Sequence, residues 1–134
     1  MKPKAKAGGI KTQLLKRSRP AKEIAARYQA SVVILEGDAA GTEYPIKKTY
    51  AVIGRSKDAA VPLNDPLVSR EHAAIEFKED AFILKDLGST NGTYMQGVIV
   101  GQRKLAHGDK FQIGDTVLQF ILQDSGRDRT YEIG

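Results

Sequence analysis

The chain has 134 residues, of which 41% are hydrophobic and 28% charged, so it suits one globular domain with a single core. It contains no cysteine, which excludes disulfides, cysteine-ligated zinc and a cysteine nucleophile. No apolar run approaches the roughly 18 residues of a membrane helix, and the lysine-rich start lacks the apolar segment of a secretory signal, so we expect a cytoplasmic protein.

The formal net charge of +5 is unevenly distributed along the chain. Residues 1–30 hold nine Lys or Arg and one acid, a balance of +8, whereas residues 31–134 hold twelve and fifteen, a balance of −3. This charge pattern predicts a basic arm over 1–30 attached to a mildly acidic domain, and we expect the domain to cover 31–123 and a tail to cover 124–134. Such arms are commonly solvated, or contact a polyanion or an acidic partner.

One short helix is predicted in the arm, over about residues 20–29. Pro20 suits a first helical turn, and an apolar stripe recurs at helical spacing, formed by Ala21, Ile24, Ala25 and Tyr28. About ten residues are too few for a stable free helix in water, so we expect this segment to dock or to fray.

From residue 31 onwards the apolar residues follow the pattern of short strands rather than of helices. The turn-forming pairs Glu79-Asp80 and Gly114-Asp115 are predicted to close two hairpins. Many short strands at regular spacing indicate an all-β sandwich of two twisted, mainly antiparallel sheets. The predicted strands cover 32–37, 41–48, 50–55, 72–78, 81–87, 98–100, 109–114 and 115–122.

Three of the predicted loops carry unusual clusters of basic and small polar residues, and loops are where binding residues usually lie. They read IGRSKD (53–58), NDPLVSREH (64–72) and LGSTNGTYM (87–95). Taken singly, each cluster also has a purely structural interpretation. A glycine allows two backbones to approach, an arginine is solvated, a serine hydroxyl closes a turn, and Asn-Gly adopts a turn with positive φ.

Taken together, these clusters resemble the forkhead-associated (FHA) domain, a β-sandwich that binds phosphothreonine. The resemblance runs from about residue 32 to about residue 122, and the basic arm lies outside it. Gly-Arg alone carries no information, but the three motifs in this order and at these separations are highly specific. They are Gly54-Arg55, Ser69-Arg70-Glu71-His72 and the STNGT block (89–93), supported by LEG (35–37), Asp65-Pro66 and the L-x-H-G-D-x-F-x-I-G run (105–114).

The resemblance implies a role for each matching position. Arg55 and Ser69 would contact the phosphate, and Arg70 would add charge there or bond the peptide main chain. Thr90 would lie beside the phosphate, and Asn91 would hold the backbone of the bound peptide. Guanidinium and hydroxyl groups are the donors that a phosphate requires, since it carries three strong acceptor oxygens.

Three further positions match residues that shape the loops of the family, namely Gly54, His72 and Gly92. We expect His72 to be structural and to form hydrogen bonds between loops. The alternative of a catalytic triad made of Ser69, His72 and Asp86 is disfavoured, because no nucleophile elbow is present. We therefore expect no catalytic residue, no metal site and no cofactor.

The sequence thus predicts a phosphothreonine-peptide binding module that mediates phosphorylation-dependent protein–protein interaction in Ser/Thr kinase signalling. The alternative is an FHA-fold interaction or assembly module that does not read phosphate, with the basic arm contacting a polyanion or acidic partner. Nucleic-acid binding through the arm is disfavoured, since Tyr28 is the only aromatic residue of the arm and a single ring offers little surface on which bases could stack.

The ligand could also come from the chain itself. Thr12 and Thr130 lie outside the predicted sandwich, and each has an aliphatic residue three places later, Leu15 and Ile133. FHA domains commonly select partners by that third position after the phosphothreonine, and some bind their own phosphorylated tails. The resemblance therefore suggests either threonine as an internal ligand once it is phosphorylated.

Overall fold

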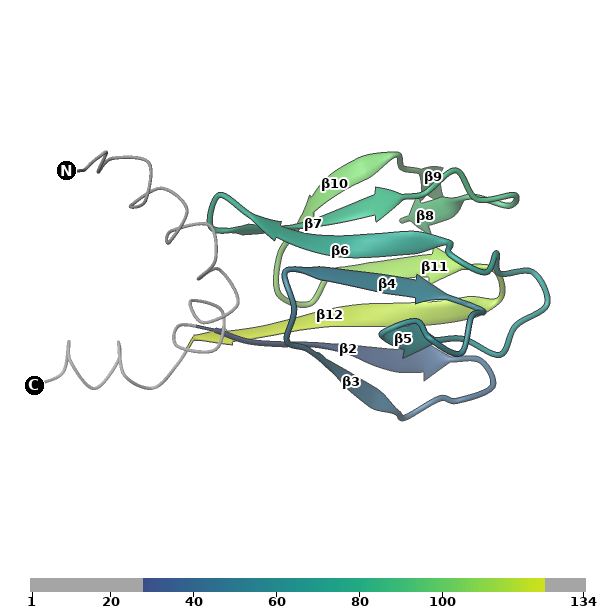
Figure 1. Cartoon of the computed structure of the whole chain (residues 1–134), viewed down its shortest axis with the longest axis horizontal. Coiled ribbons are helices and arrows are strands. Elements are labelled where there is room, and N and C mark those ends of the chain that lie inside the picture. Colours follow the sequence, from purple (N-terminus) through teal and green to yellow (C-terminus); the bar gives the residue numbers. More distant parts are fainter. Residues whose placement is uncertain (1–27, 125–134) are drawn as a thin grey trace, which may run out of the picture.

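The structure is a computed structural model that describes residues 28–124, and these form a sandwich of two β-sheets (Figure 1). One sheet has five strands in the order β10-β7-β6-β4-β5, and the other has six in the order β3-β2-β12-β11-β8-β9. The pair β4 and β5 is parallel, and the other pairs are antiparallel. The predicted all-β sandwich of mainly antiparallel sheets is therefore confirmed.

The five-stranded sheet consists of β4 (Tyr50–Gly54), β5 (Val61–Pro62), β6 (Ala73–Lys78), β7 (Ala81–Asp86) and β10 (Gln102–Leu105). The six-stranded sheet consists of β2 (Tyr28–Glu36), β3 (Glu43–Ile46), β8 (Thr93–Met95), β9 (Val98–Ile99), β11 (Lys110–Ile113) and β12 (Thr116–Asp124). Residues 28–124 contain no helix with the length and hydropathy needed to span a bilayer.

The core lies between the two sheets, because alternate residues of each strand point inward. In β12, Leu118 and Phe120 are fully buried, and they belong to the same buried cluster as Ile75 and Leu84 of the other sheet. The rings of Phe82 and Phe120 lie 5.3 Å apart, so an aromatic contact joins the two sheets. A packed core of this kind holds the strand ends, and the loops that follow them, at set positions.

The predicted hairpin turns are confirmed, and both are tight two-residue turns. Glu79 and Asp80 have positive φ values of 54° and 64°, which is the geometry of a two-residue hairpin turn. Gly114 has a φ of 62°, and Ile113 pairs with Thr116 across the Gly114-Asp115 turn.

The strand predictions missed β5, β8 and β10 and misjudged several ends. β5 has two residues and β8 has three, which is too short for a periodic signal, and the QRKL segment of β10 lacks an apolar pattern. Three of the loops that lie between strands, residues 55–60, 63–72 and 87–92, gather at the end of the sandwich opposite the start of β2 and the end of β12 (Figure 1).

The predicted helix over 20–29 lies almost entirely outside the described residues. Its last two residues, Tyr28 and Gln29, begin strand β2, so the helix prediction is wrong for them. Tyr28 pairs with Asp124 of β12, and its ring packs edge-on against Phe77 and Phe82. These long-range contacts outweigh a weak local helix preference.

Candidate functional site

The first loop (55–60), the second loop (63–72) and the third loop (87–92) are joined to one another through backbone hydrogen bonds. The N–H of Arg55 donates to the carbonyl of Ser69 at 3.0 Å, and the N–H of Ser56 donates to the carbonyl of Arg70 at 3.1 Å. The loop after β4 thus lies against the loop that precedes β6. The Nε of Arg55 also donates to the carbonyl of Val68 at 2.9 Å, which directs this exposed side chain along the second loop.

Gly54 allows this close approach, because a side chain there would have no room. An ideal Cβ on Gly54 would lie 2.1 Å from the carbonyl oxygen of Arg70 and 3.0 Å from the backbone nitrogen of His72. The carbonyl of Gly54 meanwhile accepts from the N–H of Leu63 at 2.7 Å. The glycine is therefore required by packing between backbones and not by an unusual φ.

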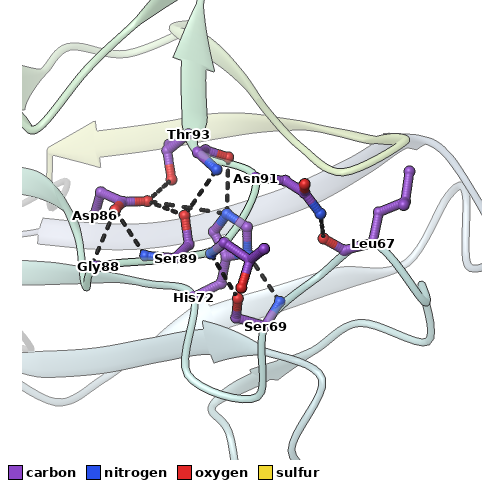
Figure 2. A network of polar contacts seen from close by, with 10 residues as sticks. Leu67, Ser69, His72, Asp86, Gly88, Ser89, Asn91 and Thr93 are labelled. Carbon is purple, nitrogen blue, oxygen red and sulfur yellow. Dashed lines mark hydrogen bonds and ion pairs between the residues drawn. The ribbon is translucent and has the colours of Figure 1, made fainter.

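His72 connects the second and third loops from a fully buried position (Figure 2). Its Nδ1 accepts from the backbone N–H of Ser69 at 3.0 Å, so its Nε2 carries the hydrogen and donates to the carbonyl of Gly92 at 2.8 Å. Gly92 has a φ of 89°, a conformation that glycine adopts without strain. The histidine thus holds the Ser69 and Gly92 backbones at a set separation.

This hydrogen bonding is incompatible with a Ser-His-Asp triad. Nδ1 of His72 is engaged by a backbone amide, and Nε2 lies 3.9 Å from Asp86, beyond hydrogen-bond distance. The hydroxyl of Ser69 accepts from the backbone N–H of Thr90, and the contact of this serine with the ring is made by its backbone N–H. Within this trio of described residues, the histidine is therefore not placed as a base for the serine, as the triad would need.

Asp86 organises the third loop from the end of β7 (Figure 2). Its Oδ2 accepts from the backbone N–H groups of Gly88 and Ser89, and its Oδ1 accepts from the hydroxyls of Ser89 and Thr93 at 2.6 and 2.7 Å. Burial alone would raise the pKa of Asp86, but these hydrogen bonds together outweigh it, so its pKa lies below its ordinary value. The loop is therefore built around a carboxylate that stays ionised.

Asp65 has the same role in the second loop. Its Oδ1 accepts from the N–H of Leu67, and its Oδ2 accepts from the N–H of Asp115 and the hydroxyl of Thr116, each at 2.9 Å. Burial acts to raise the pKa of Asp65, and these hydrogen bonds lower it by more. The loop is thereby anchored to the turn between β11 and β12.

Sequence reasoning did not identify Asp65 or Ser89 as organising residues, and it considered Asp86 only as a triad member. A local signal was present, since an Asp at the start of a Gly- or Pro-containing turn commonly accepts from amides two or three residues later. Both carboxylates do so here, Asp65 from Leu67 and Asp86 from Ser89.

All five residues predicted to bind phosphopeptide form hydrogen bonds to a neighbouring loop of the three. Ser69 Oγ accepts from the N–H of Thr90 at 3.1 Å, and Asn91 Nδ2 donates to the carbonyl of Leu67 at 2.8 Å (Figure 2). Arg55, Arg70, Thr90 and Asn91 are exposed at the surface, whereas Ser69 is half-buried. Arg70 contacts the first loop through its carbonyl.

This cluster has the chemistry of an anion site. Two exposed guanidinium groups, from Arg55 and Arg70, lie on adjoining loops with the hydroxyls of Ser69 and Thr90. Guanidinium groups and hydroxyls are donors suited to a phosphate or a carboxylate. Among residues 28–124, no group of three or more His, Asp or Glu side chains is arranged to hold a metal ion.

Comparison with known proteins identifies the same family throughout. The family model described as FHA domain matches residues 51–114. The chain is 36% identical over 92 residues to the glycogen accumulation regulator GarA of Mycobacterium tuberculosis, covering 69% of this chain and 57% of GarA. It is 34% identical over 92 residues to the oxoglutarate dehydrogenase inhibitor of Corynebacterium jeikeium, covering 69% and 64% respectively. The chain thus spans less than two thirds of the length of these relatives.

Two solved structures have the same fold. One comes from a structural and functional analysis of phosphothreonine-dependent FHA domain interactions, and it superposes on this chain with a TM-score of 0.64 at 31% identity. The match covers 69% of this chain and 95% of that one. The other is EmbR of Mycobacterium tuberculosis in complex with a low-affinity phosphopeptide, with a TM-score of 0.64 at 30% identity, covering 69% of this chain and 24% of EmbR.

Proposed function

Because this chain belongs to the FHA domain family, we propose that it is a phosphothreonine-peptide binding module, without enzymatic activity, that acts in Ser/Thr kinase signalling. The observation that carries the proposal is the meeting of Arg55, Ser69 and Thr90 at one point of the surface, through the Arg55–Ser69 and Ser69–Thr90 hydrogen bonds.

The role proposed for each binding residue follows from which of its atoms already form hydrogen bonds within the protein. Ser69 Oγ already accepts from the N–H of Thr90, so its own hydrogen is directed to a phosphate oxygen. Arg55 is held along the second loop through Nε, and it meets the phosphate with its terminal nitrogens. Asn91 is oriented by its bond to the carbonyl of Leu67, and it holds the main chain of the peptide. Arg70 adds positive charge beside the phosphate.

The expected affinity is moderate. A phosphothreonine carries a charge of about −1.5 to −2 at neutral pH, and a charge-assisted hydrogen bond contributes about 1.5–3 kcal/mol. A few such bonds, less the cost of ordering the peptide, correspond to dissociation constants of about a micromolar. Binding of this strength suits a signal that has to be reversible.

The test is calorimetric titration with one peptide in three forms, carrying threonine, phosphothreonine or phosphoserine. We expect no measurable binding of the unphosphorylated form, and weaker binding of phosphoserine by about 1 kcal/mol for the lost methyl contact. Arg55→Ala should weaken phosphothreonine binding at least about tenfold, because a charge-assisted bond is removed. Arg103→Ala is the matched control, since Arg103 is also exposed but lies on β10.

Equal affinity for the threonine and phosphothreonine forms would contradict the proposal. It would favour instead an interaction module that does not read phosphate. In that case the basic arm, which lies largely outside the described residues, becomes the segment to test for binding to a polyanion or an acidic partner.

A finer proposal concerns the source of the ligand. Thr12 and Thr130 both lie outside the described residues, and either one, once phosphorylated, occupies the Arg55–Ser69 site in the same chain or in a second copy. A tethered ligand has an effective concentration up to about millimolar, which is enough to saturate a micromolar site. The test compares chains phosphorylated at Thr12 or at Thr130 with the unmodified chain. If both bind an external phosphothreonine peptide with unchanged affinity and neither dimerises, this finer proposal is wrong.

A further inference from the structure

Asn91, which the proposed function places against the bound peptide, is followed directly by a glycine. Asparagine is a thermolabile residue, and a glycine after it favours loss of the side-chain amide, because no side chain hinders attack by the next backbone nitrogen. The chain has one other asparagine, Asn64, and an aspartate follows it. Asn91 is also exposed at the surface, so water reaches its amide. The third loop therefore holds the asparagine with the greater tendency to deamidate.

Deamidation at this position would join Asn91 to Gly92 through a cyclic imide. The backbone nitrogen of Gly92 attacks Cγ of Asn91, a C–N bond forms, and the side-chain nitrogen leaves as ammonia with the hydrogen that the backbone nitrogen gives up. Water then opens the imide at either carbonyl and leaves aspartate or isoaspartate, so neither an oxidant nor a reductant is needed. The nitrogen of Gly92 has to be free for this step, and the amide of Asn91 has to turn toward it.

The structure requires the glycine that makes this reaction easy. Gly92 has a φ of 89°, a conformation that residues with a side chain rarely adopt. An ideal Cβ there would lie 3.0 Å from Ile99 Cδ1 and 3.2 Å from Tyr94 Cε1. Since Asn91 serves the proposed site and Gly92 serves the loop, protection against deamidation has to come from other residues.

Two hydrogen bonds of the folded loop oppose formation of the imide. The N–H of buried Gly92 donates to Ser89 Oγ at 2.9 Å, so the attacking nitrogen is engaged. The Ser89 hydroxyl donates in turn to Asp86 Oδ1 at 2.6 Å, which fixes its oxygen beside Gly92 (Figure 2). The amide of Asn91 is held by the carbonyl of Leu67 at 2.8 Å, away from the ring-closing position. Both bonds have to break before the imide forms.

We propose that Ser89, held by Asp86, protects Asn91 from deamidation, and that loss of this protection irreversibly silences the phosphothreonine site. Aspartate at position 91 would place a negative charge beside the phosphate and would turn an acceptor, in place of the Nδ2 donor, toward the carbonyl of Leu67. Isoaspartate would in addition lengthen the backbone of the loop. The silencing rests on the proposed function, whereas the protection does not.

The test of protection follows the amide-to-acid conversion at Asn91 by tryptic mass spectrometry, during incubation at neutral pH. The samples are the unaltered chain, the same chain unfolded in urea, and a synthetic peptide of residues 86–95. We expect the folded chain to deamidate at least about tenfold more slowly than the peptide, because hydrogen bonds have to open first, and the unfolded chain to match the peptide. A folded chain that deamidates as fast as the peptide overturns the proposal.

Three variants test whether Ser89 supplies the protection. Ser89→Ala should raise the rate of deamidation at Asn91 about three- to tenfold, because it frees the nitrogen of Gly92. Thr93→Val removes another hydrogen bond to Asp86 and keeps the bond to Gly92, so its rate should stay within about twofold of the unaltered chain. Ser56→Ala, the matched control, removes a serine-to-amide bond from the first loop and should leave the rate unchanged.

An unchanged rate in Ser89→Ala overturns the proposal, and so does an equal rise in Thr93→Val, since general loosening of the loop would then explain both. The silencing is tested with Asn91→Asp, which should bind a phosphothreonine peptide at least about tenfold more weakly than the unaltered chain in calorimetric titration. Unchanged affinity in Asn91→Asp overturns the silencing. Equal binding of phosphorylated and unphosphorylated peptides by the unaltered chain overturns the proposed function and the silencing with it, while the deamidation rates still decide the protection.

Discussion

Replacing Gly54 by alanine should damage stability and binding together. The added Cβ would lie 2.1 Å from the carbonyl oxygen of Arg70, and real Cβ contacts do not fall below 3.0 Å, so the first and second loops must separate by about 1 Å. The hydrogen bonds from Arg55 and Ser56 to the second loop, now 3.0 and 3.1 Å, would then lengthen beyond bonding distance.

The free-energy cost follows from these contacts. Two backbone hydrogen bonds contribute about 0.5–1.5 kcal/mol each, and the overpacking adds about 1–3 kcal/mol, so the free energy of unfolding should fall by about 2–6 kcal/mol. Phosphothreonine binding should weaken at least about tenfold even where the domain stays folded, because Arg55 moves relative to Ser69 and a charge-assisted bond is lost.

Urea denaturation measures the loss of stability, and calorimetric titration well below the melting temperature measures the loss of phosphothreonine affinity. Gly101→Ala is the matched control, because a Cβ there meets no atom within 4 Å. This control should leave binding unchanged and stability unchanged or raised by about 0.4–1 kcal/mol. If Gly54→Ala has the stability and affinity of Gly101→Ala, the close approach of the two backbones does not constrain the site.

Three further predictions concern the residues that hold the loops. His72→Ala should reduce the free energy of unfolding by about 2–4 kcal/mol in urea denaturation, because it opens a cavity and leaves two backbone groups unpaired; a loss of binding at constant stability would show that His72 is a contact residue. Asn91→Ala should lower the free energy of unfolding by at most about 1 kcal/mol, since its hydrogen bond to Leu67 is at the surface, yet it should weaken peptide binding at least about tenfold in titrations. An unchanged peptide affinity would show that Asn91 is not part of the site. The pKa values of Asp65 and Asp86 are lowered by folding, so their stabilising contribution is complete above the unfolded value of about 3.9 and is lost as pH falls through the folded values. Melting temperatures measured from pH 6 down to pH 2.5 should therefore fall less steeply below pH 4 in Asp86→Asn than in the unaltered chain, and parallel curves would contradict this.

The fold class could be read from the sequence because strand periodicity and turn chemistry are local. The Glu79-Asp80 and Gly114-Asp115 pairs indicated hairpins, and both form. The strands β5 and β8 could not be predicted, since a strand of two or three residues is defined by its partner and not by its own pattern. Strand β10 has four residues but lacks an apolar pattern. The same reason explains Tyr28, which pairs with β12 instead of ending a helix.

The sequence by itself determined which residue types stand in the three loops, and with them the family and the candidate binding residues. Only the tertiary structure decided how those residues are held. Asp65 accepts from Asp115 and Thr116, which lie 50 and 51 residues later in the chain, and so anchors the second loop to the turn between β11 and β12. His72 holds the backbones of Ser69 and Gly92 at a set separation, and Gly92 lies 20 residues after His72 in the chain. Such contacts arise from packing between strands, so no local pattern of residues specifies them.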